Sequence, residues 1–164
     1  HVLHLLEDMA VPDHTRNDPH PEGSPYENFT KEKKINVEVL STKQSINLKS
    51  VDEYFDNVAK YSNGGFYSAD SINNYKSPKP DYFKKEGKFK FGFRYDEDMG
   101  DYKLVKTNKD LFLTNYNNRN INHPEILQDY WDRLSIKAIQ HGAGMLSLFF
   151  KEANRKKDSD RAIS

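Results

Sequence analysis

The sequence predicts a mainly α-helical fold with a small β-hairpin inserted in it. Residues 1–11 form an apolar run, and apolar residues from Leu127 to Phe149 recur at steps of three and four, as on one face of a long helix. Between these segments, the aromatic residues of 89–95 alternate with Lys, Gly and Arg, which is the period-two pattern of a strand.

The composition indicates one folded domain or part of one. The chain has 164 residues and a formal net charge of zero, and its 10 Phe, 10 Tyr and one Trp argue against disorder. The mean hydropathy is -0.94, and no apolar stretch approaches the ~18 residues that a membrane span needs. Zero net charge excludes a strongly basic nucleic-acid binder, and the absence of cysteine leaves only His and carboxylate side chains as strong metal ligands.

The first half of the chain is expected to hold two helices. Residues 1–11 predict a buried helix, because apolar residues cover nearly every face, and Pro12 is expected to end it. Residues 12–34 have the composition of a loop, and residues 35–49 alternate weakly, as a short strand or an extended connection would. A capping-box pattern at Ser50 predicts a helix over 51–61.

The second half is expected to hold the hairpin and the longest helix. Residues 66–87 are predicted to be irregular, 96–101 to form a charged turn, and 102–105 to return as the partner strand. A helix is predicted over about 124–153, followed by a frayed polar tail. Gly142 and Gly144 inside this helix indicate a close helix contact or a bend.

The chemistry-bearing residues gather near the N-terminus. His4 and Asp8 are four residues apart and share one helix face, and His14 follows just after Pro12. A buried carboxylate is costly unless it is paired or bound to a metal, and imidazole with carboxylate ligands suits zinc. The alternative is an internal His–Asp hydrogen bond in a helical core.

The loop that follows adds three further candidate ligands, His20, Glu22 and Glu27. Each of them taken alone is more simply a solvated loop side chain.

A family resemblance rests on residues 4–17, HLLEDMAVPDHTRN. They resemble the signature of zinc-dependent phospholipase C and the S1/P1-type nucleases, H-Y-x-G/T-D-hydrophobic-x-x-P-x-H-x-x-N. The matching fixed positions are His4, Asp8, Met9, Pro12, His14 and Asn17, and the departures are Leu5, Glu7 and Ala10. Residues 65–72 and 134–150 are more weakly similar to an uncharacterised bacterial branch of that superfamily.

This resemblance implies an incomplete phospholipase C/P1 nuclease-like helical fold. Residues 1–155 would be the C-terminal portion of such a domain, and 156–164 a polar tail. A cluster of up to three zinc ions would be completed by a missing N-terminal part of the same protein, so the catalytic base has no counterpart in this chain. Family members are usually exported.

The resemblance also implies a ligand set. His4 and Asp8 would bind one zinc ion and His14 another. The family places an H-x3-E pair where this sequence has Asn28 and Glu32, so His20 with Glu27 is the expected substitute.

The activity that the resemblance implies is zinc-dependent hydrolysis of a phospholipid or another phosphodiester. Zinc lowers the pKa of bound water toward ~7 and neutralises phosphoryl charge. A nucleic-acid substrate is allowed, but zero net charge does not favour it. The departures at Glu7 and Asn28 favour the alternative, a non-catalytic interaction module that keeps the helical scaffold.

The remaining motifs are expected to be structural. His141 is predicted to be a core histidine, His123 to belong to the start of the last helix, and His1 to be exposed. The spacing in 96–101 does not fit a calcium loop. The strand at 89–95 is expected to be half-buried, with stacking on single-stranded nucleic acid as its alternative.

Overall fold

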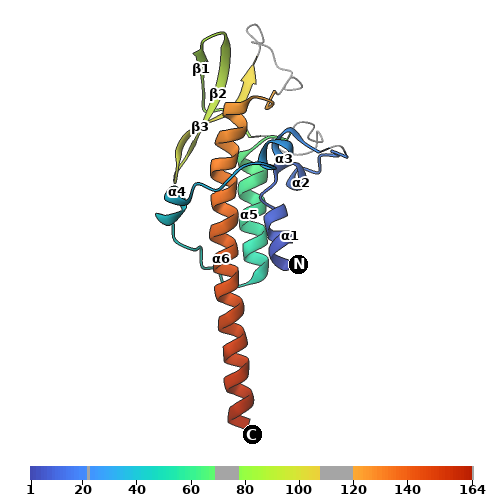
Figure 1. The fold of residues 1–164 in the computed structure, drawn as a ribbon, viewed down its shortest axis with the longest axis vertical. Coiled ribbons are helices and arrows are strands. Elements are labelled where there is room, and N and C mark those ends of the chain that lie inside the picture. The colour runs from blue at the N-terminus through green and yellow to red at the C-terminus, as the bar shows by residue number, and fades with distance from the viewer. Residues whose placement is uncertain (22, 69–77, 108–119, 164) are drawn as a thin grey trace.

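The structure is a computed structural model that describes residues 1–21, 23–68, 78–107 and 120–163. The elements follow the chain in the order α1 (Val2–Asp8), α2 (Pro12–Thr15), α3 (Pro25–Thr30), α4 (Val37–Ser41), α5 (Val51–Gly65), β1 (Tyr82–Glu86), β2 (Phe89–Asp96), β3 (Gly100–Thr107) and α6 (Pro124–Ile163). In Figure 1, α5 and α1 lie alongside α6, and the sheet lies against the N-terminal end of α6.

The predicted mainly helical fold with a minor hairpin is wrong. The described part of the chain is 54% helical and 16% in a three-stranded antiparallel sheet, which makes it a small α+β domain. The strand order is β1-β2-β3, so the predicted hairpin carries an additional edge strand. That strand lies in the segment 66–87, for which the sequence predicts irregular structure.

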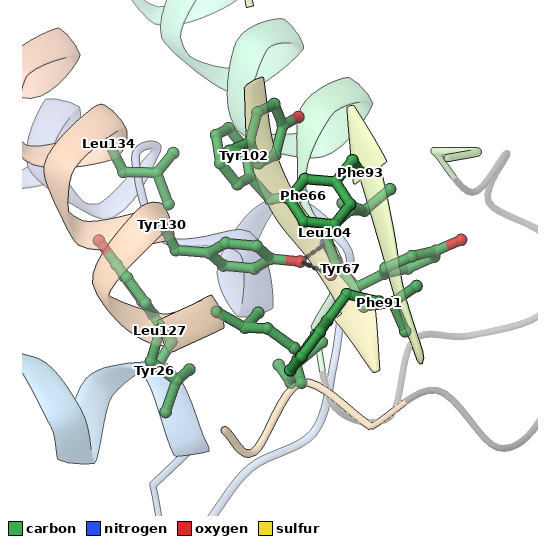
Figure 2. Close-up of a cluster of buried hydrophobic side chains, with 13 residues drawn as sticks. Tyr26, Phe66, Tyr67, Phe91, Phe93, Tyr102, Leu104, Leu127, Tyr130 and Leu134 are labelled. Atoms are coloured by element: carbon green, nitrogen blue, oxygen red, sulfur yellow. Dashed lines mark hydrogen bonds between the residues drawn. The ribbon is translucent and has the colours of Figure 1, made fainter. Parts of the chain in front are cut away.

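The sheet builds one side of the larger hydrophobic core (Figure 2). Tyr130 of α6 is fully buried at its centre, donates a hydrogen bond to the carbonyl of Leu104 in β3 at 2.7 Å, and accepts one from the amide of Tyr67 at 3.1 Å. The ring of Phe66 packs edge-on against Tyr130 with centroids 4.8 Å apart. Since helix, sheet and the chain after α5 meet at Tyr130, the sheet is an integral layer of the domain.

Arg133 ties the β2–β3 turn to α6. Its Nη2 donates hydrogen bonds to the carbonyls of Met99, Gly100 and Asp101 at 2.9 to 3.3 Å. Within the turn, Asp96 Oδ1 accepts from the amides of Asp98 and Met99, both at 2.9 Å, so this acidic stretch forms the predicted charged turn.

A second core joins α1, α5 and α6 through Leu6, Ala10, Tyr54, Val58 and Met145. Here α6 comes very close to the chain before α5, because a Cβ added at Gly144 would lie 1.8 Å from the carbonyl oxygen of Ile46. The glycines predicted a close helix contact or a bend; Gly144 does make a close contact, but with the non-helical chain before α5.

Three predictions about helices are wrong. Helix α1 ends at Asp8 and buries only Leu6, whereas Val2 and Leu5 are exposed; Pro12 opens the next helix, where its missing N–H costs nothing. The stretch 35–49 contains α4 and no strand. The tail after Lys156 continues α6 to Ile163.

The helix predicted over 51–61 is confirmed, and it extends to Gly65. Ser50 Oγ accepts from the amide of Glu53 at 3.3 Å as predicted, while the Glu53 carboxylate accepts from the amide of Lys49 at 2.8 Å. Within the described ranges, no helix combines the length and the apolar character needed to cross a membrane.

Candidate metal centre

The helix α2 is a rigid support for His14. Arg16 is fully buried, and its Nη1 donates to the carbonyl of Asn63 at the end of α5 at 2.7 Å. Asn63 Nδ2 donates back to the carbonyl of Thr15 at 2.6 Å. These two bonds attach α2 to α5, so the position of His14 depends on the fold and not on a mobile loop.

The helix α3 fixes Glu27. Ser24 Oγ accepts from the amide of Glu27, and the amide of Ser24 donates to Glu27 Oε2, both at 3.1 Å. This reciprocal capping box, with Pro25 in the first turn, is encoded locally by the sequence Ser24-Pro25-Tyr26-Glu27. It holds the carboxylate on the side of the helix where His14 and His20 lie.

His14, His20 and Glu27 converge on one small volume. Nε2 of His14 lies 3.3 Å from Glu27 Oε1, and Nε2 of His20 lies 3.3 Å from Glu27 Oε2. The two imidazole rings are stacked, with centroids 5.3 Å apart and planes 19° apart. One ligand atom from each of the three residues lies within 4.8 Å of the others, so these side chains can share one metal ion.

His20 is held in the tautomer that a metal requires. Its Nδ1 lies 2.5 Å from the carbonyl of Asp18, and because a carbonyl only accepts, Nδ1 carries the hydrogen. Burial lowers the pKa of His20, but the Asp18 carbonyl and the negative charges of Glu27 and Asp13 outweigh burial and raise it overall. In the neutral ring, Nε2 therefore presents its lone pair toward Glu27.

Asp8 and His4 lie on the other side of His14. Asp8 Oδ1 is 3.8 Å from His14 Nδ1, while His4 Nε2 is 4.0 Å from Asp8 Oδ2 and the His4 side chain is 77% exposed. An imidazole that binds a metal through Nε2 has Nδ1 left for a carboxylate that orients it. At 3.8 Å Asp8 is at ion-pair and not hydrogen-bond distance from His14, and His4 lies at the edge of the cluster.

The five predicted ligands therefore form one chain of contacts in the order His4, Asp8, His14, Glu27 and His20. The three residues that converge are His14, His20 and Glu27, whereas His4 and Asp8, which the resemblance assigns to another ion, lie beside them. Glu22 lies outside the described residues.

The spacing of the three converging groups is compatible with one shared metal ion. Zinc ligands lie about 2.1 Å from the ion, so two ligands of a tetrahedral ion lie roughly 3.4 Å apart. Each Nε2 lies 3.3 Å from a different oxygen of Glu27, close to this spacing, and the same distances also describe His–Glu ion pairs in the metal-free protein.

The burial of Asp13 is not predicted by the sequence. It is fully buried, and within the described residues neither of its carboxylate oxygens meets hydrogen-bond geometry with a partner. Burial raises the pKa of Asp13, although the nearby Ser24 side chain offsets part of the rise. An acidic residue at the start of a helix is typical of a solvated position, so no local signal indicates its burial.

The other histidines lie apart from this cluster. His141 is fully buried, with Nδ1 2.7 Å from the carbonyl of Lys137 and Nε2 2.8 Å from Asn57 Oδ1, in agreement with the predicted core histidine. Burial lowers its pKa. The backbone carbonyl of His123 accepts a hydrogen bond from the amide of Leu127 at the start of α6, and the His123 ring packs edge-on to Phe91 with centroids 5.1 Å apart.

No protein-family model matches the chain, and no curated protein or solved structure matches it either. The molecule is thus defined by its own geometry as a small α+β domain with a candidate His/Glu metal centre. The resemblance carried by residues 4–17 stays a prediction.

Proposed function

We propose that His14, His20 and Glu27 bind one zinc ion, and that this centre takes part in the hydrolysis of a phosphodiester. The proposal is carried by the two Nε2 atoms that each lie 3.3 Å from the same carboxylate, which the Ser24 cap holds in place. Three protein ligands leave one position of a tetrahedral ion open, as in catalytic zinc sites.

The surroundings support a functional centre. Hydrogen bonds from outside the ligand shell orient His20 and Glu27, and Asp8 lies against the second nitrogen of His14. The His14 side chain is 31% exposed, so a substrate has access to it. When bound, zinc would supply an activated water and neutralise phosphoryl charge.

The substrate class rests on the resemblance of residues 4–17 to zinc-dependent phospholipases and nucleases. A phospholipid or another phosphodiester is therefore the proposed substrate.

The zinc site is tested by calorimetric titration of the chain with zinc, comparing Glu27→Gln with Ser24→Ala. Gln at position 27 can still accept from the Ser24 amide, so the helix cap persists while the ligand charge is lost. We expect Glu27→Gln to weaken zinc binding at least tenfold. Ser24→Ala should cost about 1 kcal/mol of stability through the lost cap and change the affinity much less.

The catalytic part is tested separately with bis(4-nitrophenyl) phosphate and phospholipid vesicles. Zinc-dependent hydrolysis that is lost in His14→Ala supports the enzyme. Stoichiometric zinc binding without hydrolysis supports a non-catalytic, metal-stabilised interaction module. Failure to bind zinc contradicts both the centre and the reaction proposed for it.

A further inference from the structure

The three-stranded sheet has a basic end, at the turn between β1 and β2. In Figure 1 this turn lies at the opposite end of the molecule from the C-terminus of α6. Residues 82–90 and 103–107 meet there, because Lys85 pairs with Lys90 and Lys90 with Thr107 across the strands. The charged residues of these two stretches are six lysines and one carboxylate, namely Lys84, Lys85, Lys88, Lys90, Lys103, Lys106 and Glu86.

The other end of the sheet is acidic, so charge is separated along the strands. The β2–β3 turn and its flanks contain Asp96, Glu97, Asp98 and Asp101. Asp98 forms an ion pair with Lys137 of α6, so this acidic end is attached to the helix. The formal net charge of zero for the whole chain therefore hides a concentration of positive charge at the β1–β2 turn.

Most of the positive charge at the basic end is not neutralised by the protein itself. The two oxygens of Glu86 lie 3.1 Å from Lys84 Nζ and 2.9 Å from Lys103 Nζ, so this carboxylate is already shared. In the part of the chain that the structure describes, the lysines of the basic end that form no ion pair with a carboxylate include Lys85, Lys88 and Lys106.

The lysines of β1 and β2 also repel one another. Lys85 lies directly opposite Lys90, and like charges in this position destabilise a sheet. Lysines on an edge strand such as β1 protect the edge from pairing with another chain. That role does not explain Lys88 in the turn or Lys90 in the central strand. A bound polyanion would offset the repulsion between these side chains.

The ring contacts at the basic end favour a charged surface over a single strand of nucleic acid. Bases stack on open ring faces. Here the ammonium of Lys90 lies 5.1 Å from the ring centre of Phe83. Those of Lys88 and Lys106 lie 5.2 and 4.7 Å from the ring centre of Phe89.

The position of the lysines also suits a flat surface. They surround the end of a hairpin at one extremity of the molecule, so several of them can reach a planar partner at the same time (Figure 1). A bilayer that contains anionic lipids is a surface of this kind, and clusters of lysine are attracted to it.

We propose that the basic end of the sheet docks on the surface of a bilayer that contains anionic lipids. The lysine ammonium groups bind the anionic headgroups electrostatically, and no segment needs to cross the bilayer. The choice of a lipid surface also rests on the proposed phospholipid substrate, but the docking itself requires neither zinc nor hydrolysis.

The proposal is tested by sedimenting the metal-free full chain with vesicles of phosphatidylcholine, alone or mixed with phosphatidylserine. We expect binding to the mixed vesicles only, and weaker binding as the salt concentration rises. The double variant Lys85→Glu, Lys88→Glu should weaken binding by about tenfold or more. The sheet should persist, because a carboxylate at position 85 would lie opposite Lys90.

A matched control is the double variant Lys156→Glu, Lys157→Glu. It changes the net charge by the same amount on exposed residues of α6, far from the sheet, and should leave binding unchanged. Equal losses in the two double variants would mean that net charge alone drives binding, and would overturn the proposal.

Two other results would also overturn it. One is no binding to the mixed vesicles, which would leave the β1 lysines with edge protection alone, and the other is tighter binding to a single-stranded oligonucleotide than to the vesicles. The docking and the proposed function fail separately. Vesicle binding without zinc-dependent hydrolysis supports the docking and counts against the enzyme, whereas hydrolysis of bis(4-nitrophenyl) phosphate without vesicle binding does the reverse.

Discussion

At the scale of the residue, the molecule is most unusual where charged side chains are buried near the candidate metal centre. Asp13 and Arg16 are both fully buried in or beside the four-residue helix α2. Arg16 is hydrogen-bonded to Asn63, while neither oxygen of Asp13 meets hydrogen-bond geometry in the described part of the chain, although the Ser24 side chain is near enough to lower its pKa in part. Burial of such a carboxyl is costly for the fold.

We therefore predict that Asp13→Asn stabilises the metal-free protein. Because the folded-state pKa of Asp13 is raised above 3.8, the folded protein binds this proton more tightly than the unfolded chain, and the carboxyl costs stability as the pH rises through the folded pKa. At pH 7 the free energy of unfolding should rise by about 1 kcal/mol, as for relief of an unsatisfied buried group. The gain should shrink toward pH 4, and a loss at pH 7 in denaturant titrations would contradict this account.

His20 and His141 should have pKa values on opposite sides of 6.5, the ordinary pKa of histidine. The Asp18 carbonyl and the nearby carboxylates raise the pKa of His20 against the effect of burial, whereas burial lowers the pKa of His141. His20 therefore contributes stability that is present below 6.5 and lost as the pH rises through its folded pKa. His141 contributes stability that is present above pH 6.5 and is lost as the pH falls through its lowered folded pKa.

The check is an NMR titration of the two rings in metal-free protein. His20 should titrate above 6.5 and His141 below it, and zinc should abolish the titration of His20 alone. If the titration curves of His20 and His141 coincide, or if zinc changes the titration of His141 and not that of His20, the environments assigned to the two rings are wrong.

At the scale of the element, capping residues in the sequence predict the start of a long helix well, but short elements such as α4 are predicted poorly. Ser50 caps α5 as expected, and the alternation of Phe89, Phe91 and Phe93 correctly indicates β2. The stretch Val37-Glu38-Val39 alternates like a strand, yet Asn36 Oδ1 accepts from the amide of Val39 at 3.1 Å and starts a helix instead. A single cap decides so short an element.

The edge strand β1 was not predicted from the sequence for a different reason. Its first four residues are all exposed, so it has no buried face and no alternation that the sequence could show. It exists because β2 offers a paired edge, and because Pro80 and Phe83 cover Gly92; a Cβ at Gly92 would lie 2.6 Å from Pro80.

The two glycines of α6 provide a matched pair of substitutions. A Cβ at Gly144 would lie 1.8 Å from the Ile46 carbonyl, whereas one at Gly142 would meet nothing closer than Leu3 at 3.9 Å. Gly142→Ala should stabilise the protein by up to ~1 kcal/mol through helix propensity. Gly144→Ala should destabilise it by ~1–3 kcal/mol or more through overpacking against backbone.

Thermal unfolding of the two variants measures this difference. Equal effects from the two substitutions would mean that the chain before α5 does not lie against α6 in solution.

At the scale of the whole molecule, the fold class was mispredicted because distant segments complete the core. The sheet is stabilised by Phe66 and Tyr130, which come from the chain before and after it. Sequence patterns within the strands cannot predict packing against residues so far away in the chain. Helical periodicity dominates the sequence because α6 alone spans Pro124–Ile163, and a count of periodic segments therefore underweights the sheet.

The candidate site was predicted by residue type but not by arrangement. The Pro12-to-His14 turn and the Ser24 cap are local features, and they bring His14 and Glu27 together across the intervening loop. For His20, the nitrogen that faces the carboxylate is set by the hydrogen bond from Nδ1 to the Asp18 carbonyl, and the position of Asp8 beside His14 requires the tertiary structure.

Zinc-edge X-ray absorption on the zinc-loaded chain, with the metal content measured on the same sample, tests the centre most directly. One zinc per chain is predicted, with two imidazole nitrogens and a carboxylate oxygen at about 2.0–2.2 Å, and with the imidazole signal reduced by one ring in His20→Ala. Loss of zinc on gel filtration of the wild type, or a coordination shell unchanged in His20→Ala, would contradict the assignment of His14, His20 and Glu27 as a metal centre.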